Sequence, residues 1–272
     1  TKLLYKRKKL INKNHQKPFS DEIKTKYKNA RNAMDDFYKS DNPHLNENKI
    51  VKLLDNATGA GVVINKNVTI DFAGFTYSFN EGVGSTGTKT NGFQILKGNT
   101  VTLKNGTLNV AEEAQNKFYI LVQNYANLNV VDMNLDGTFL DKYSKSTDPK
   151  DGDSYVLSNN CGIVNISGVT NITANNDGNK AFAFDVCDKQ PTYTAPVVTV
   201  TTTGRITGKI EVSETISENI HIQGGTYDFD VEEAGYCDNA YFTKDNGDVT
   251  WTVEGPYEEK IGETRYTSLA KA

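Results

Sequence analysis

Short runs in which apolar and polar residues alternate fill the chain from Gly59 onward, and Asn, Gly and Asp separate these runs. In one of them, Val101 and Leu103 alternate with Thr102 and Lys104. A period of two places the apolar side chains on one side of a strand and the polar ones on the other. The pattern therefore predicts an all-β fold of short strands joined by tight turns.

The runs also repeat along the chain. Six of them begin, in order, at Val68, Val101, Leu128, Val164, Val198 and Ile220. Their starts are 33, 27, 36, 34 and 22 residues apart, an average of (220 − 68)/5, or about 30, which lies in the window that indicates a solenoid or array. A second apolar run precedes most of them, beginning at Gly61, Gly92, Phe118, Ser154 and Ala181. Each repeat would thus carry two or three strands.

Repeats of this kind predict a right-handed parallel β-helix, or β-solenoid. A single coil has nothing to cover its apolar side chains, whereas coils stacked about 4.8 Å apart align them into a continuous core. An Asn side-chain ladder would bond the backbone of the corners; its candidates, each one residue before a run, are Asn67, Asn99, Asn127 and Asn219. An antiparallel β-sandwich is the competing fold, because the same short strands can build it.

The first 56 residues have a different character. Ser20, followed by two acidic residues, is a typical helix N-cap. We predict one α-helix from there to about Ser40, ahead of Asn42-Pro43. Its apolar stripe would pack against the end of the β-helix or against a sister chain. The stripe includes Ile23, Tyr27, Met34 and Phe37.

Charge divides the chain into a basic arm and an acidic body. Residues 1–50 hold 13 Lys and Arg against 6 Asp and Glu, a balance of +7, so the remainder holds 30 − 13 = 17 against 34 − 6 = 28, or −11. Such an arm is expected to dock on an acidic protein surface, nucleic acid or anionic lipid, and a solvated tail without a partner is the alternative. The expected anchoring residues are Lys6, Arg7, Lys8, Lys9, Lys13 and Lys17.

The pattern changes again near the C-terminus. A turn signal at 245–248 precedes an alternating strand that ends at Val253, which predicts a small hairpin that caps the β-helix. The predicted organisation is a basic arm over 1–56, a parallel β-helix over 57–235 and a C-terminal cap and tail over 236–272.

No set of residues suggests metal or cofactor binding. Cys161, Cys187 and Cys237 lie far apart and are odd in number, so they predict neither a disulfide framework nor a metal-binding pair. His221 alternates with Ile220 and Ile222, and its ring is therefore expected to point outward. We predict no metal, cofactor or catalytic residues.

An enzyme is the least favoured interpretation. Glycosidic hydrolysis needs two carboxylates across one groove, and the adjacent pair Asp35-Asp36 falls on the predicted helix, where a solvated face explains it better. A polysaccharide lyase or hydrolase would have to rely on a carboxylate of the repeats, such as Asp132 or Asp185.

Several motifs resemble a known group of proteins. The segments VTIDFAGFTYSF from Val68 and VTLKNGTLNV from Val101 resemble the β-solenoid repeats of phage and prophage virion proteins and of surface proteins from gut Firmicutes. The segment from Ile222 to Val253 is similar to a module of the same proteins with the pattern GGTF and then NGDGTWTV, although Tyr227 replaces Phe and Val249 replaces Gly. The resemblance covers about 62–253 and implies no catalytic residues.

The resemblance and the basic arm together suggest a structural virion protein of a bacteriophage: a capsid decoration, head fibre or spike. The arm would anchor on capsid, portal or tail proteins, and the solenoid would project as a homotrimer. No apolar segment follows the basic residues of 1–17, so we expect no export signal, no membrane span and synthesis in the host cytoplasm. The alternative is an adhesin on a bacterial cell surface that binds host-surface glycans.

Overall fold

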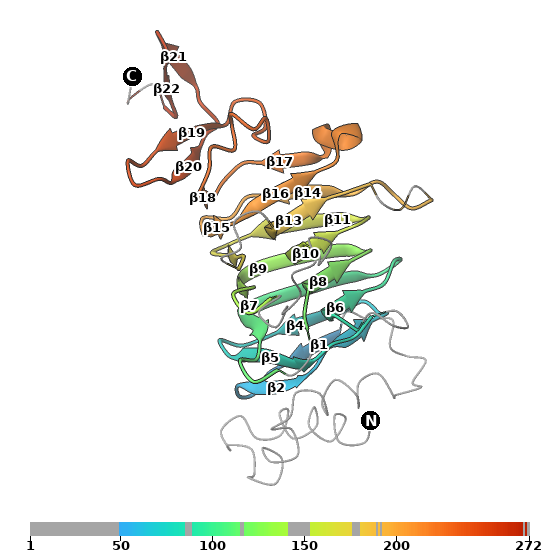
Figure 1. Ribbon diagram of the computed structural model, residues 1–272. Coiled ribbons are helices and arrows are strands. Elements are labelled where there is room, and N and C mark those ends of the chain that lie inside the picture. Colours follow the sequence, from blue (N-terminus) through green and yellow to red (C-terminus); the bar gives the residue numbers. More distant parts are fainter. Residues whose placement is uncertain are drawn as a thin grey trace, which may run out of the picture.

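The computed structural model describes residues 49–84, 89–114, 117–140, 153–175, 180–188, 190, 192–268 and 270. Within these residues the protein consists of β-strands and one short 3-10 helix, η1 (Glu214–Asn219). Most of the strands stack in parallel along one axis (Figure 1). The predicted all-β class and the parallel pairing are confirmed.

The chain runs over three faces in the same order in each coil, and each face gains one strand segment per coil. The first face contains β1 (Lys49–Lys52), β4 (Val68–Asp71), the first halves of β7 (Thr100–Val110) and β9 (Asn127–Asp136), β11 (Ile163–Ser167), β14 (Val197–Val200) and β17 (Ile220–Ile222). The second contains β2 (Ala57–Ala60), β5 (Thr76–Glu81), the second halves of β7 and β9, β12 (Asn171–Thr173), β15 (Arg205–Thr207) and β18 (Thr226–Tyr227). The third is a separate six-stranded sheet of β3 (Val62–Ile64), β6 (Asn91–Ile95), β8 (Ile120–Asn124), β10 (Ser154–Asn159), β13 (Ala181–Val186) and β16 (Lys209–Val212).

The register of the first face matches the predicted repeats residue for residue. The Cα partners run from Val68 to Val101, Leu128, Val164, Val198 and Ile220. All pairings between neighbouring coils on the three faces are parallel in the part of the chain that the structure describes. The competing antiparallel sandwich is therefore excluded.

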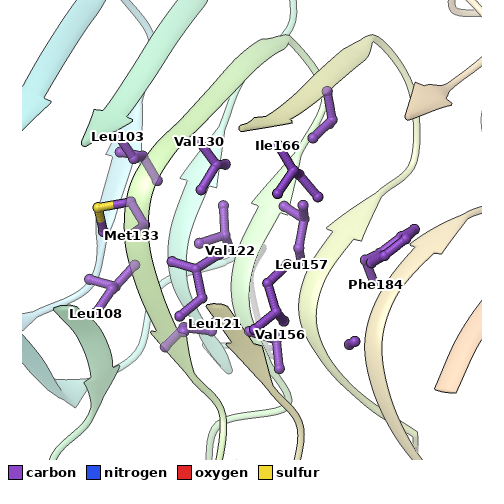
Figure 2. Close-up of a cluster of buried hydrophobic side chains, with 14 of the residues drawn as sticks. Leu103, Leu108, Leu121, Val122, Val130, Met133, Val156, Leu157, Ile166 and Phe184 are labelled. Atoms are coloured by element: carbon purple, nitrogen blue, oxygen red, sulfur yellow. The ribbon is translucent and has the colours of Figure 1, made fainter. Parts of the chain in front are cut away.

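The core lies between the three faces and continues from coil to coil (Figure 2). Leu103, Val130 and Ile166 reach it from the first face, and Val122 and Leu157 from the third, all with 0% exposure. Alternate residues of the same strands, such as Thr102, remain partly exposed, as the period of two predicts. Each fully buried aliphatic side chain stabilises the fold by about 1.5–3 kcal/mol, so the coils hold one another in place.

Three of the four asparagine side chains predicted to bond the backbone of the corners do so. The Asn67 Oδ1 accepts a hydrogen bond from the Thr100 backbone N–H at 2.8 Å. The Asn99 Nδ2 donates to the Leu96 carbonyl at 2.8 Å, and the Asn219 Nδ2 donates to the Pro196 carbonyl at 2.9 Å. Asn127 contributes its backbone N–H, which donates to the Asn99 carbonyl at 3.0 Å.

Antiparallel pairing appears at the C-terminal end of the stack. β20 (Trp251–Glu254) pairs antiparallel with both β18 and β19 (Phe242–Asp245), which confirms the predicted hairpin. A smaller hairpin of β21 (Glu259–Ile261) and β22 (Thr264–Tyr266) follows. Because β20 runs against the last parallel strand of the second face, the hairpin covers an edge that would otherwise accept another strand.

The predicted N-terminal helix, its apolar stripe (Ile23, Tyr27, Met34, Phe37) and the anchoring residues from Lys6 to Lys17 lie outside the described residues. Within the described residues, the parallel stack already includes β1, which pairs with β4 and lies inside the segment assigned to the arm. No helix within the described ranges is long and apolar enough to cross a membrane.

Candidate functional site

The outer side of the six-stranded sheet carries a row of polar side chains. In register, from β6 to β16, the row consists of Gln94, Gln123, Ser158, Asp185 and Glu211. Their neighbours along the strands, such as Asn159 and Val186, point into the core with 0% exposure, and a strand turns successive side chains to opposite sides. The row therefore changes from amides to carboxylates toward the C-terminal end.

Two carboxylates meet at the end of this row. Asp185 is only 4% exposed, and it accepts hydrogen bonds from the Asn159 backbone N–H and, at 3.2 Å, from the Ser158 hydroxyl. Glu211 accepts a hydrogen bond from the Tyr155 hydroxyl at 2.6 Å. Internal donors thus reach both carboxylates.

Cys187 completes this group, which we call the acidic cluster: Tyr155, Asp185, Cys187 and Glu211. One ligand-type atom each from Asp185, Cys187 and Glu211 lies within 4.8 Å of the others. The spacing alone would permit a cation, but donors from Asn159, Ser158 and Tyr155 already bond both oxygens of Asp185 and one oxygen of Glu211. We therefore assign no metal site here.

Burial dominates the electrostatics of the acidic cluster. Desolvation, opposed by the hydrogen bonds from Asn159 and Ser158 and reinforced by Glu211, raises the pKa of Asp185 to about 7. Burial and the nearby carboxylates raise the pKa of Cys187 to about 12. Burial and the hydrogen bond to Glu211 also raise the pKa of Tyr155. At neutral pH the thiol and the phenol are protonated, and Asp185 is close to its midpoint.

Aromatic side chains surround the polar row. The rings of Tyr155 and Phe182 stack with centroids 5.0 Å apart, because β10 and β13 are neighbours in register. Farther along the sheet, the Lys97 Nζ lies 4.2 Å from the centroid of the Tyr193 ring. Tyr193 lies between β13 and β14 in the sequence, so its ring contacts a residue that follows β6 in another coil.

The carboxylates named in the enzyme hypothesis are not brought together. Asp132 is exposed and sits in β9 with φ 52°, at the bend between the first and second faces, where its Oδ1 accepts a hydrogen bond from the Val169 N–H at 2.8 Å. Asp185 lies on the third face. A glycosidase needs two carboxyl groups open to one substrate, whereas Asp185 is buried and its oxygens are occupied.

The sequence pattern did not predict that Tyr155 and Glu211 lie in one cluster with Asp185. Tyr155 and Glu211 are 56 residues apart in the chain, and only the register of three strands places them together. The available signal was the outward position of each residue in its strand. The expectation for His221 is confirmed: its side chain is 37% exposed between two buried isoleucines, and its Nδ1 lies 2.7 Å from the Asp238 Oδ1.

Comparisons with protein-family models, with curated proteins and with solved structures found no match.

Proposed function

We propose that the protein is a right-handed parallel β-solenoid with a structural attachment role, and that it belongs to a bacteriophage particle. The observation that carries this proposal is the uninterrupted parallel stack from β1 to β18 with one continuous core, followed by an antiparallel hairpin. Right-handed crossovers between parallel strands are the strong rule in proteins. A rod of this kind suits projection of a surface away from its point of attachment.

The chemistry of the described residues supports a non-catalytic role. The acidic cluster gathers four titratable side chains on the third face, and its hydrogen bonds join β10 to β13 and β16. Asp185 is closed to a substrate by its burial, and Glu211 is held by Tyr155. Function is argued from sites and not from fold, and this arrangement favours stability over turnover.

The proposed anchor is the basic arm. Its balance of +7 against −11 for the rest of the chain suits a contact with an acidic capsid, portal or tail surface, and a closed homotrimer would align three rods on one axis. The virion is the proposed location.

Particle incorporation tests the anchor. The variant Lys8→Gln/Lys9→Gln removes two arm charges, and the matched control Lys244→Gln/Lys260→Gln removes two exposed charges in the C-terminal part of the chain. We expect the arm variant to assemble into particles less than the control, with a smaller deficit at high salt, because salt screens the electrostatic contribution of the two lysines. Equal incorporation of arm variant, control and wild type would contradict the anchoring role.

A glycan-binding adhesin is the second candidate, and one observation favours it. Tyr155 and Phe182 are partly exposed on the outer surface that also carries Gln94 and Gln123, and aromatic rings with amides are typical of ligand-contacting surfaces. Binding of the purified chain to a glycan array, lost in Phe182→Ala and kept in Thr107→Ala on the second face, would support this candidate over the virion protein.

A further inference from the structure

Asp185 and Glu211, each with a carboxylate oxygen within 4.8 Å of the other, lie at a boundary of the fold. β16 is the terminal strand of the six-stranded sheet and pairs only with β13 within the described residues. Asp185 of β13 and Glu211 of β16 are register partners. The chain then continues directly into η1, where Ile216 is buried. The pair therefore joins the last strand of the third face to the rest of the stack.

The groups that face the pair are mostly acidic or neutral. Cys187 follows β13, and Tyr155 approaches from β10. Two more distant groups also act on the cluster: Tyr125, next to β8, lies in the field of Asp185, and Asp153, before β10, lies in the field of Tyr155. Lys209 is the charged residue nearest to Glu211 along β16, and its register partner is Phe182 and not Asp185.

A proton decides whether this contact attracts or repels. With one proton present, a carboxyl and a carboxylate can lie side by side, and the protonated group can donate a hydrogen bond. Without it, two like charges face each other, with Asp185 buried and Glu211 partly exposed, and such a pair is unfavourable. The hydrogen bonds from Asn159 and Ser158 hold Asp185 in place in either state. The repulsion between the two carboxylates is therefore relieved by movement of β16.

We propose that Asp185 and Glu211 form a pH-sensitive seam: with a shared proton they hold β16 on β13, and on loss of that proton β16 and η1 open locally from the stack. The core and the first and second faces are expected to stay closed, because β14 to β18 pair there through uncharged residues, Arg205 and His221, and none of them faces a like charge in register. The device would loosen one side of the C-terminal coil in neutral to alkaline surroundings and tighten it in acid. This inference concerns regulation and does not depend on the proposed virion role.

Amide hydrogen exchange of the full chain tests the seam. Protection of peptides covering 209–219 is measured at pH 5.5 and pH 8.5, corrected for the intrinsic exchange rate, with peptides of β9 as the internal reference. We expect the protection of 209–219 to be at least about tenfold lower at pH 8.5 than at pH 5.5. The protection of the β9 peptides should change by less than about twofold, which is about the error of the measurement.

Two variants make the test decisive. Asp185→Asn and Glu211→Gln each remove one charge of the pair, and both are expected to abolish the pH dependence in 209–219. The control Asp132→Asn removes an exposed carboxylate on β9 and should leave the dependence as in the wild type. If Asp185→Asn does not fold, Glu211→Gln still tests the idea. Unchanged protection of the wild type between the two pH values would overturn the proposal, as would variants that retain the full effect.

Discussion

The side-chain amide of Asn124 donates a hydrogen bond of 2.9 Å to the side-chain oxygen of Asn159 in the next coil, and both residues have 0% exposure. The pair lies in one inward row of the third face between Ile95 and Val186. Asn124 also closes its own corner, because its Nδ2 donates to the Ala126 carbonyl at 2.8 Å and its Oδ1 accepts from the Ala126 N–H at 3.2 Å. Two polar residues thus replace aliphatic ones without leaving their amides unpaired.

Replacing Asn124 should therefore cost more than its size suggests. Asn124→Leu removes the acceptor of the Ala126 N–H and the donor to Asn159, and leaving buried polar groups unpaired costs about 1–3 kcal/mol. Urea unfolding of the full chain measures the loss. The control Asn165→Leu changes an exposed Asn of the first face and should stay within about 0.5 kcal/mol. Similar costs for both variants would show that the buried pair adds nothing.

Close approach of two coils makes Gly162 irreplaceable. Gly162 has φ +87°, and an added Cβ would fall on the carbonyl oxygen of Ala126 in the coil below. Gly74 has nearly the same φ, +85°, but open space around it. Gly74→Ala should cost about 1 kcal/mol from backbone strain alone, and Gly162→Ala should cost at least about 2 kcal/mol more. Equal melting temperatures for Gly74→Ala and Gly162→Ala would show that the clash with Ala126 adds no cost.

Stability should depend on pH through Asp185. Its pKa is about 7 in the folded state and about 3.9 when unfolded. Between these values the folded chain holds a proton that the unfolded chain has released, so the free energy of unfolding falls as pH rises from about 4 to 7. The full loss has an upper bound of about 4 kcal/mol. Asp185→Asn should flatten this slope and be more stable than wild type at pH 8.

Unfolding curves at several pH values from 4 to 9 provide the measurement. Asp132→Asn is the matched control, because it removes an exposed carboxylate and should keep the wild-type slope. A wild-type stability that rises between pH 4 and 7 would contradict the assigned direction of the pKa shift.

Much of the fold follows from periodicity. The starts Val68, Val101 and Leu128 are register partners, because apolar side chains that recur with each coil have one alignment that buries them all. The acidic cluster does not follow in the same way. Its members lie in the outer row of the third face, and the starts of successive coils are 22 to 36 residues apart, so the sequence does not show which polar residues of different coils become neighbours. The buried Asn124 was equally hidden, since an asparagine beside a turn normally indicates an exposed corner.

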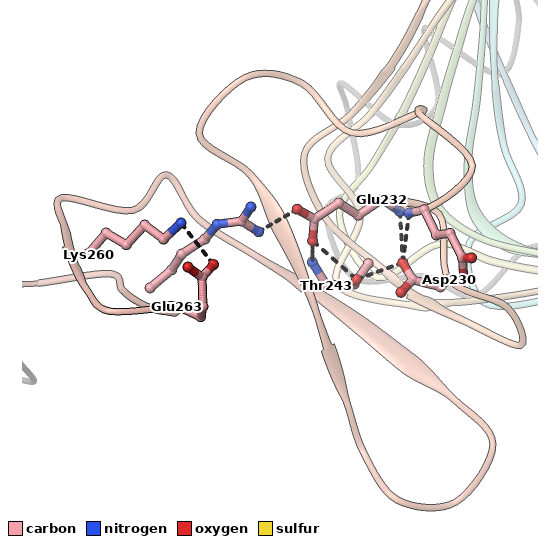
Figure 3. Close-up of polar contacts among 7 residues, drawn as sticks. Asp230, Glu232, Thr243, Lys260 and Glu263 are labelled. Atoms are coloured by element: carbon pink, nitrogen blue, oxygen red, sulfur yellow. Dashed lines mark hydrogen bonds and ion pairs between the residues drawn. The ribbon is translucent and has the colours of Figure 1, made fainter.

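Arg265 should hold the last hairpin against the rest of the C-terminal module. Its guanidinium pairs with Glu232, which also accepts a hydrogen bond from the Thr243 N–H at 2.9 Å (Figure 3). The Arg265 Cζ lies 5.6 Å from the ring centroids of both Phe242 and Tyr257. An ion pair at partial burial and a cation–π contact together contribute about 1–2 kcal/mol. Because these contacts link β22 to the first hairpin, their loss should release the C-terminal segment without unfolding the stack.

Chymotrypsin should therefore cleave Arg265→Ala near Tyr257 about five- to thirtyfold faster than wild type. Lys260→Ala breaks a pair whose partner Glu263 is 97% exposed, so its cleavage should match wild type. Faster cleavage in both variants would instead mean that the hairpin opens regardless of Arg265.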